Sequence, residues 1–160
     1  MDEPKRIKIT DPNIALSKAE RYCAYQERSQ QEVRDKLYEW GLWPDAVENI
    51  ITTLIGGNFL NEERFAKAYA QGKFNQKHWG RIKIKQGLKF KRVSEPLIKK
   101  ALQVIDPDEY MSVLQRLLDK KAAGISEKEP YKRRYKLQQY ALSRGFENDL
   151  ILDILKDSEL

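Results

Sequence analysis

The sequence predicts an all-α protein in which three tandem three-helix repeats form an elongated, curved array. The first reason is local: apolar residues recur at helical spacing, with Ser, Asn or Asp before the runs and Gly after them. The second is long-range: Leu37, Leu88 and Leu142 lie at similar places in successive apolar runs, 51 and 54 residues apart. Repeats of this size stack in a line and leave a continuous concave side.

The apolar positions that follow these leucines repeat as well. Leu42 and Val93 come five residues after their leucines, whereas Phe146 comes four residues after Leu142, so the third copy carries a one-residue slip. Nine helices of about 11–12 residues would fill most of the chain. We therefore predict a flexible N-terminal arm followed by three repeats, with the bounds 1–12, 13–57, 58–105 and 106–160.

Caps set the helix limits in the first repeat. Ser17 with Glu20 fits a capping box in a first helix over about Ile14–Glu27, and an earlier start of this helix is also compatible with the sequence. Ser29 caps the second helix, and Pro44 suits the first turn of the third. The apolar stripes of these helices predict a core that contains two tryptophans, Trp40 and Trp43.

The second repeat contains the one ambiguous element. It opens clearly, because Asn61 is a good N-cap and Leu60 and Phe65 occupy the positions of a hydrophobic staple. In Gly80–Lys91, however, apolar and basic residues alternate with period two, which favours a strand. A lone strand would lack a partner, so the repeat favours a helix there.

Turn and cap residues also divide the third repeat. Asp106 with Pro107 starts its first helix, and a linker then leads to a helix over Tyr131–Ser143. Gly145 ends that helix, and Glu147–Lys156 forms the last one.

Composition excludes most catalytic chemistry. Cys23 is the only cysteine and His78 the only histidine among 160 residues, so no disulfide and no zinc set is expected. The chain has no glycine-rich phosphate loop, signal segment or apolar run long enough to span a membrane. We expect a soluble cytoplasmic protein with no cofactor and no catalysis of its own.

Positive charge is concentrated in the middle of the chain. The segment Lys73–Lys100 contains ten Lys or Arg residues and one acid, Glu95, a local charge of +9 in a chain whose formal net charge is +6. Few acidic neighbours are available to pair with these cations, and aromatic residues lie among them. The pattern predicts a polyanionic partner, either nucleic acid or a protein assembled on it.

Two groups of residues are candidates for this contact. Trp79 could stack on a base, although core packing is the simpler reading of its position. A second basic cluster lies near the start of the helix over Tyr131–Ser143, so that two parts of a curved body could grip one partner. The candidates are Lys73, Lys77, Trp79, Arg81, Lys83, Lys85, Lys89, Lys91, Arg92, Lys132, Arg133, Arg134 and Lys136.

Three motifs along the chain form a recognisable set: QQEVRDKL after Arg28 and Ser29, FLNEERFA at Phe59–Ala66, and GRIKIKQGLKFKRV from Gly80. Together they resemble the RecX regulatory family of bacteria. The second motif is the most specific, and the likeness extends over nearly the whole chain. Gly87 departs from the pattern, since a plain helix former is expected at that position.

The resemblance implies an elongated monomer of three three-helix repeats. It implies that this body lodges in the groove of the recombinase RecA polymerised on single-stranded DNA. It also implies modulation, usually inhibition, of strand exchange, ATP hydrolysis and the coprotease function of that filament, in DNA repair, recombination and the SOS response.

Two other functions fit the composition. A stand-alone helix-turn-helix protein would select a duplex DNA sequence without a protein partner. A pure protein scaffold would bind the recombinase equally well after Lys83, Lys85, Lys89 and Lys91 are changed to Glu.

Overall fold

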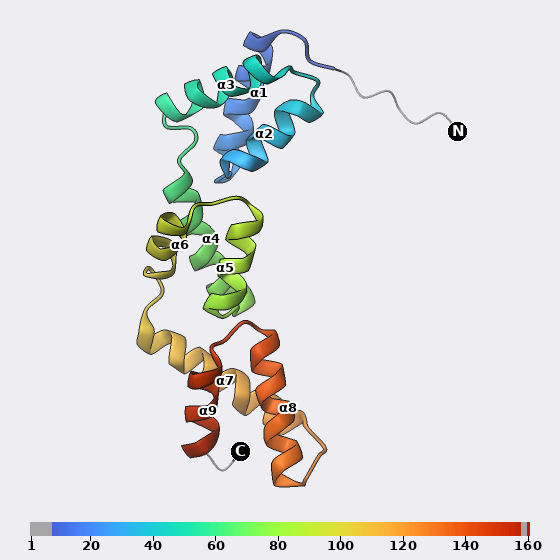
Figure 1. Cartoon of the computed structure of the whole chain (residues 1–160), viewed down its shortest axis with the longest axis vertical. Helices are drawn as coiled ribbons and strands as arrows, with labels where there is room; N and C mark the ends of the chain where they lie inside the picture. Colours follow the sequence, from blue (N-terminus) through green and yellow to red (C-terminus); the bar gives the residue numbers. More distant parts are fainter. Residues whose placement is uncertain (1–7, 158–159) are drawn as a thin grey trace, which may run out of the picture.

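The computed structural model describes residues 8–157 and Leu160, and within them it is all-α, without strands. The helices are α1 (Pro12–Tyr25), α2 (Gln30–Glu39), α3 (Pro44–Gly56), α4 (Glu62–Lys77), α5 (Arg81–Phe90), α6 (Glu95–Leu102), α7 (Pro107–Gly124), α8 (Pro130–Ser143) and α9 (Asn148–Asp157). They form three stacked three-helix units, α1–α3, α4–α6 and α7–α9, in an elongated column (Figure 1). The predicted fold class is confirmed.

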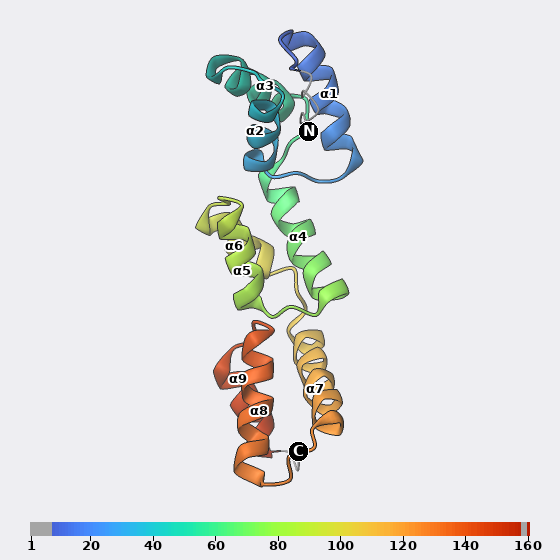
Figure 2. The ribbon, with the colours of Figure 1, turned by 90° about the vertical axis from the view of Figure 1, so that its right-hand side faces the viewer.

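The column is curved, and the second helix of each unit lies on its inner side. In Figure 1, α2, α5 and α8 lie along one side and α3, α6 and α9 along the other. A quarter turn shows α4 and α7 following one another along the long axis (Figure 2). A partner bound on the concave side would therefore contact α2, α5 and α8.

The segment Gly80–Lys91, whose alternation favoured a strand, forms a helix. Close contact with α4 explains why a glycine stands at position 87. Residues Arg81–Phe90 form α5, with Ile84 and Leu88 buried. Gly87 faces α4, where an added Cβ would stand 2.1 Å from the hydroxyl oxygen of Tyr69. A helix former with a side chain does not fit at position 87 without displacing that ring.

The same turn ends the second helix in all three units. Gly41, Arg92 and Gly145 have left-handed φ values of 101°, 58° and 94°. The residue after each turn closes the helix with a backbone hydrogen bond. These bonds run from Leu42 N to Leu37 O, Val93 N to Leu88 O and Phe146 N to Ala141 O, at 3.2, 3.1 and 3.2 Å.

This geometry corrects the register of the third repeat. The residue equivalent to Leu37 and Leu88 is Ala141, which is 1% exposed, and not its neighbour Leu142. The offsets are then 51 and 53 residues, and the one-residue slip disappears. The small Ala141 fills the buried position, so matching leucine to leucine selected the wrong residue.

The buried residues of the described part of the chain form two separate cores rather than three. One contains buried residues of the first repeat, from Ala15 to Leu60. The other runs from Phe65 to Leu155 and joins the second and third repeats. The ring centroid of Tyr110 lies 5.8 Å from that of Phe74 and 5.1 Å from that of Phe146, so aromatic packing crosses the second junction.

Several local predictions for the first repeat were wrong. α1 begins at Pro12 with Asp11 as its cap, because Asp11 accepts the amide of Asn13, so the Ser17 capping box does not start it. Trp43 is 49% exposed and lies outside the core, whereas Trp40 is buried. The proposed flexible arm falls mostly on residues 1–7, outside the described residues, but the amide of Ile9 donates to the carbonyl of Trp40 at 2.8 Å.

The staple predicted at the start of α4 does not form. Asn61 caps α4 as expected, since its side chain accepts the amide of Arg64. Leu60 belongs to the core of the first repeat, however, whereas Phe65 belongs to the other core. The boundary between the two cores therefore falls between these residues.

Candidate polyanion and protein interface

The structure gathers part of the predicted site around Trp79. The Nζ atoms of Lys73 and Lys83 lie 4.9 and 4.6 Å from the centre of a Trp79 ring, and that of Lys73 lies 5.4 Å from the ring of Tyr69. His78 adopts a left-handed conformation after α4, which turns the chain back toward α5. Trp79 is partly buried against the core, and Lys73 and Lys83 lie over its rings. It therefore contributes to core packing and also lies within the basic surface.

Two lysines of α5 and the lysine that follows this helix have acidic partners, contrary to the expectation from sequence. Lys85 and Lys89 reach Glu95 at 3.7 and 3.1 Å, and Lys91 reaches Glu32 of the first repeat at 3.4 Å. The hydrogen bond from Lys89 lowers the pKa of the Glu95 carboxyl. The two Glu95 pairs are solvent-exposed and individually weak, so a phosphate or a partner's carboxylate could replace Glu95 at low cost, whereas the Lys91–Glu32 pair is partly buried.

Arg81 and Arg133 are held by contacts within the chain. Arg81 pairs with Glu147 at 2.7 Å and stacks 3.9 Å from the centre of the Tyr110 ring. Arg133 donates to the carbonyls of Ala122, Ile125, Glu127 and Leu160, at 2.5, 3.2, 3.1 and 2.6 Å. Arg81 thus fastens the second repeat to the third, and Arg133 satisfies carbonyls at the end of α7.

The buried hydroxyl of Tyr110 completes the Arg81 contact. It accepts the amide of Arg81 at 3.0 Å and donates to a carboxylate oxygen of Glu147. Burial, together with the hydrogen bond to Glu147, raises the pKa of the Tyr110 phenol well above its ordinary value of 10.0. The neutral phenol is therefore part of the folded junction.

This raised pKa predicts a loss of stability at alkaline pH. Above about pH 10 the unfolded chain releases the Tyr110 proton while the folded chain retains it, so the free energy of unfolding should fall by up to about 1.4 kcal/mol per pH unit. Denaturant unfolding at pH 9, 10 and 11 measures the slope. Tyr110→Phe is the control: its slope should be shallower, and equal slopes would contradict the assignment.

Four predicted cations have no ion pair, ring contact or side-chain hydrogen bond within the described residues. They are Lys77, Arg92, Lys132 and Arg134. Lys136, by contrast, pairs with Glu127 at 3.8 Å. The chain therefore presents unpaired positive charge at the end of α4, at the turn after α5 and on α8.

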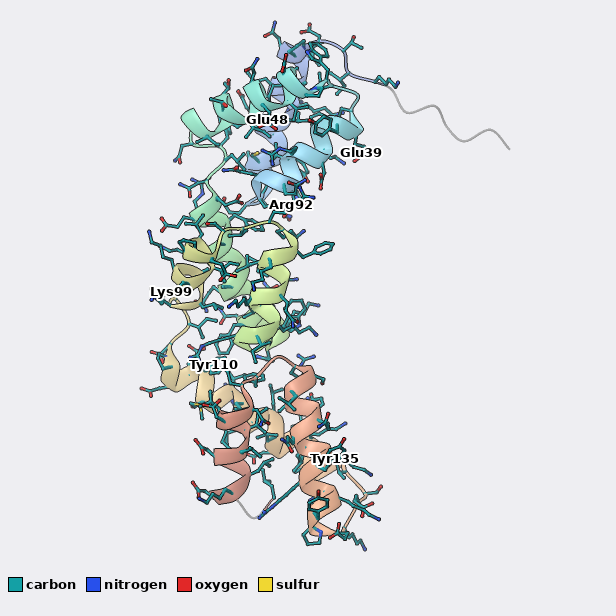
Figure 3. All side chains as sticks on the ribbon, viewed as in Figure 1. Glu39, Glu48, Arg92, Lys99, Tyr110 and Tyr135 are labelled. Atoms are coloured by element: carbon teal, nitrogen blue, oxygen red, sulfur yellow. The ribbon has the colours of Figure 1, made fainter. Side chains whose placement is uncertain are left out.

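Sequence reasoning missed two tyrosines among the α8 cations. Tyr131 and Tyr135 are 78% and 56% exposed, and their i, i+4 spacing places both on one face of α8. Figure 3 shows Tyr135 at the far end of the column from Glu39 and Glu48. Exposed aromatic rings beside Lys132 and Arg134 form the combination that stacks bases while neutralising phosphates. The spacing was visible in the sequence, but the exposure was not.

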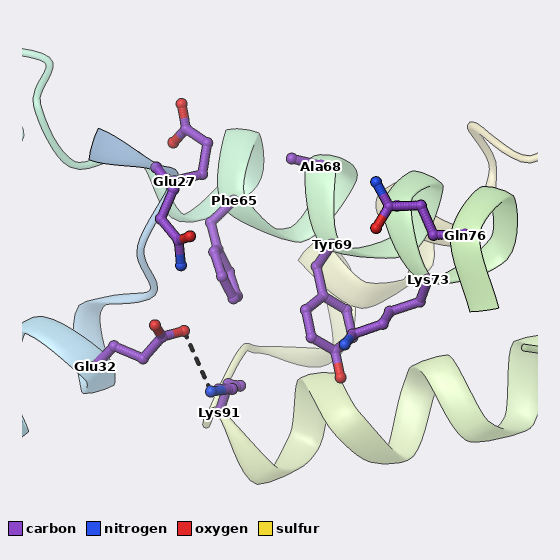
Figure 4. Close-up of a pocket in the computed structure, with 10 residues that line it drawn as sticks. Glu27, Glu32, Phe65, Ala68, Tyr69, Lys73, Gln76 and Lys91 are labelled. Atoms are coloured by element: carbon purple, nitrogen blue, oxygen red, sulfur yellow. Dashed lines mark ion pairs between the residues drawn. The ribbon is translucent and has the colours of Figure 1, made fainter. Parts of the chain in front are cut away.

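A cleft of about 520 Å³ lies where the first repeat meets the second (Figure 4). Glu27 and Glu32 line its first-repeat side, and Lys73 and Lys91 line the other. Figure 4 shows the Glu32–Lys91 pair bridging the opening, with Tyr69 and Lys73 side by side beyond it. Because acidic and basic side chains both line the cleft, it does not favour binding of an anion. It marks the boundary between the first and second repeats.

The described part of the chain contains neither a candidate metal site nor a candidate membrane-spanning helix. No group of three or more His, Cys, Asp or Glu side chains there could hold a metal ion. None of the helices described is long and apolar enough to cross a membrane.

Three models of known domains match the chain, one for each repeat. The first, second and third three-helix domains of RecX match residues 15–54, 61–102 and 108–155. Together they account for most of the sequence, in the order in which the domains are numbered.

Individual relatives agree with these matches. "Regulatory protein RecX" of Clostridium perfringens (strain 13 / Type A) is 33% identical over 131 residues, which are 81% of this chain and 61% of that protein. The protein of the same name from Haemophilus influenzae (strain PittGG) is 26% identical over 92% of this chain and 96% of its own length. The chain thus spans about three fifths of the clostridial relative.

The solved structures include the same fold. The crystal structure of RecX from Lactobacillus salivarius superposes with a TM-score of 0.83 at 26% identity, over 91% of this chain and 95% of that one. A second structure, described as regulatory protein RecX, gives the same TM-score at 25% identity over 92% of this chain and 72% of that one.

Proposed function

Because this chain belongs to the RecX family, we propose that it binds the filament that RecA forms on single-stranded DNA and inhibits its activity. The observation that carries the proposal is the placement of the basic residues. Lys83, Lys85 and Lys89 belong to α5, the middle helix of the curved inner side. A charged, elongated body of this kind fits a long polyanionic groove better than a compact ligand.

The proposed action is purely one of binding. The chain acts as a cytoplasmic monomer without cofactor, and its charged residues serve as contacts rather than as acids, bases or metal ligands. Exposed lysines release counterions from phosphates, and the partly buried Trp79 keeps Lys73 and Lys83 close together.

ATP hydrolysis by RecA on single-stranded DNA tests the proposal. Titration with this protein should lower the rate to a low plateau at near-stoichiometric ratios. If about six phosphates are neutralised, the logarithmic salt slope is about −4, and doubling the salt weakens binding by about 20-fold. An unchanged ATPase rate at the lower salt concentration would refute the proposal.

A second candidate is a stand-alone nucleic-acid-binding protein, and the exposed tyrosines of α8 favour it. Tyr131 and Tyr135 could stack bases without any protein partner. Binding to the bare oligonucleotide decides between the two functions. A filament regulator should bind the RecA–DNA filament far more tightly than either component, whereas a stand-alone binder should show the same affinity with and without RecA.

A further inference from the structure

Phe90 is exposed to an extent that the fold does not explain. Its exposed fraction is 86%, the largest of any exposed large hydrophobic side chain in the described part of the chain. It is the last residue of α5, the helix whose buried face is formed by Ile84 and Leu88. An aromatic ring left in water contributes nothing to folding, and such rings often mark contacts with partners.

The other two repeats show what the fold requires at this position. With offsets of 51 and 53 residues, Phe90 corresponds to Glu39 at the end of α2 and to Ser143 at the end of α8. Both are polar, so the helix end does not need an aromatic residue. Phe90 is therefore a departure specific to the second repeat.

A second departure lies two residues further along the same turn. Arg92 adopts the left-handed conformation with φ 58°, where the equivalent residues are Gly41 and Gly145. A side chain destabilises this conformation relative to glycine, because its Cβ crowds the backbone there. Strain that persists at an exposed position points to a use for the side chain.

The residues on either side of Phe90 in the sequence are cationic. Lys89 and Lys91 flank Phe90, and their ammonium groups lie 3.1 and 3.4 Å from carboxylates of Glu95 and Glu32. Figure 3 places Arg92 at the end of the second repeat that faces the first. The turn Lys89–Arg92 thus presents one exposed apolar ring whose neighbours in sequence are cationic.

We propose that the turn Lys89–Arg92 is a protein-docking anchor, in which Phe90 inserts into an apolar pocket with an acidic rim on the partner. The inference rests on the proposed function in naming that partner as RecA in its filament. A buried aromatic anchor with charged neighbours at the rim is the usual arrangement of an interaction hot spot.

The charges around the turn favour a protein over nucleic acid. Glu95 lies 3.1 Å from Lys89 and is exposed, but Glu32, 3.4 Å from Lys91, is partly buried and also accepts a hydrogen bond from the Ser29 hydroxyl, so a phosphate backbone seated here would meet a fixed negative charge. A protein surface can offer hydrogen-bond donors to those carboxylates and acids to Arg92. Phe90 itself has no polar group with which to read a base.

The decisive comparison is Phe90→Ala against Tyr25→Ala. Tyr25 is 83% exposed at the end of α1, so its removal matches the loss of an exposed ring at another site. Phe90→Ala should weaken binding to the RecA–DNA filament by about 30-fold and leave the thermal midpoint unchanged, whereas Tyr25→Ala should bind like the parent protein. Arg92→Gly should raise the thermal midpoint and weaken filament binding.

Parallel titrations with the filament and with a bare thymidine oligonucleotide separate the outcomes. Unchanged filament binding by Phe90→Ala overturns the anchor while the proposed function stands. Equal losses on filament and on bare oligonucleotide overturn it in favour of a base-stacking wedge. If the parent protein does not bind the filament, the proposed function fails and this assignment of the partner fails with it.

Discussion

Gly80→Ala is expected to lower the free energy of unfolding by about 3 kcal/mol and the thermal midpoint by about 6–12 °C. An added Cβ at position 80 would stand 2.3 Å from the backbone carbon and oxygen of Gly145. The amide of Gly80 also donates to the carbonyl of Arg144 at 2.8 Å, and that of Ile82 to the carbonyl of Gly145 at 2.9 Å. Because backbone lies on both sides, no side-chain rotation can relieve the clash.

Gly72→Ala is the matched control for this change. Gly72 lies inside α4, and an added Cβ there meets nothing within 4 Å. Alanine should therefore raise stability by about 0.5–1 kcal/mol. Thermal melts of both variants measure the contrast, and a Gly80→Ala protein as stable as the parent would show that the second junction is not held by this glycine contact.

Reversing the charge of Lys83, Lys85, Lys89 and Lys91 to Glu should abolish inhibition of the RecA filament. The change removes four cations from the second repeat and places new carboxylates beside Glu95 and Glu32. We expect at least about 100-fold weaker filament binding, through both lost attraction and new repulsion. ATP hydrolysis titrations with the variant measure the effect.

Two further variants separate loss of binding from loss of folding. Changing the same four lysines to Gln should retain the fold and give a partial loss. A control with the same change in net charge reverses four exposed lysines on other helices, namely Lys67, Lys99, Lys120 and Lys156. This control should still inhibit, and full inhibition by the α5 variant would refute the placement of the site and favour a pure protein scaffold.

Sequence periodicity was sufficient for the fold because helix signals are local. Caps at Ser29, Asn61 and Asp106 each accept the amide three residues ahead, as their sequence context predicts. Period two in α5 was misleading on its own, and comparison with the first repeat identified the helix. The register of the third repeat failed because Ala141, a small residue, occupies a position held by leucine elsewhere.

The candidate site was less predictable because its contacts join distant parts of the chain. Arg81 looked like a free cation, yet its partner Glu147 lies 66 residues away. Lys91 likewise finds Glu32 in another repeat. The exposure of Trp43 and Phe90 was equally hidden, since an apolar residue on an amphipathic helix can lie just outside the stripe that packs.

The two junctions of the column differ in kind, and this decides where the protein can bend. The second junction is locked by shared aromatic packing and glycine contacts. The first depends on polar links that cross it, among them Arg64 to Glu27 at 2.5 Å, the amide of Gln30 to Glu62 at 3.1 Å, and Lys91 to Glu32. Ion pairs of this kind weaken as salt screens them.

If the protein binds a helical polymer that changes its pitch, we expect residues 12–60 to rotate as one rigid arm, without repacking of either core. Fluorescent probes on the first and third repeats should report a salt-dependent separation, while probes on the second and third should not. We therefore expect the angle between the first and second repeats to vary and the angle between the second and third to stay fixed.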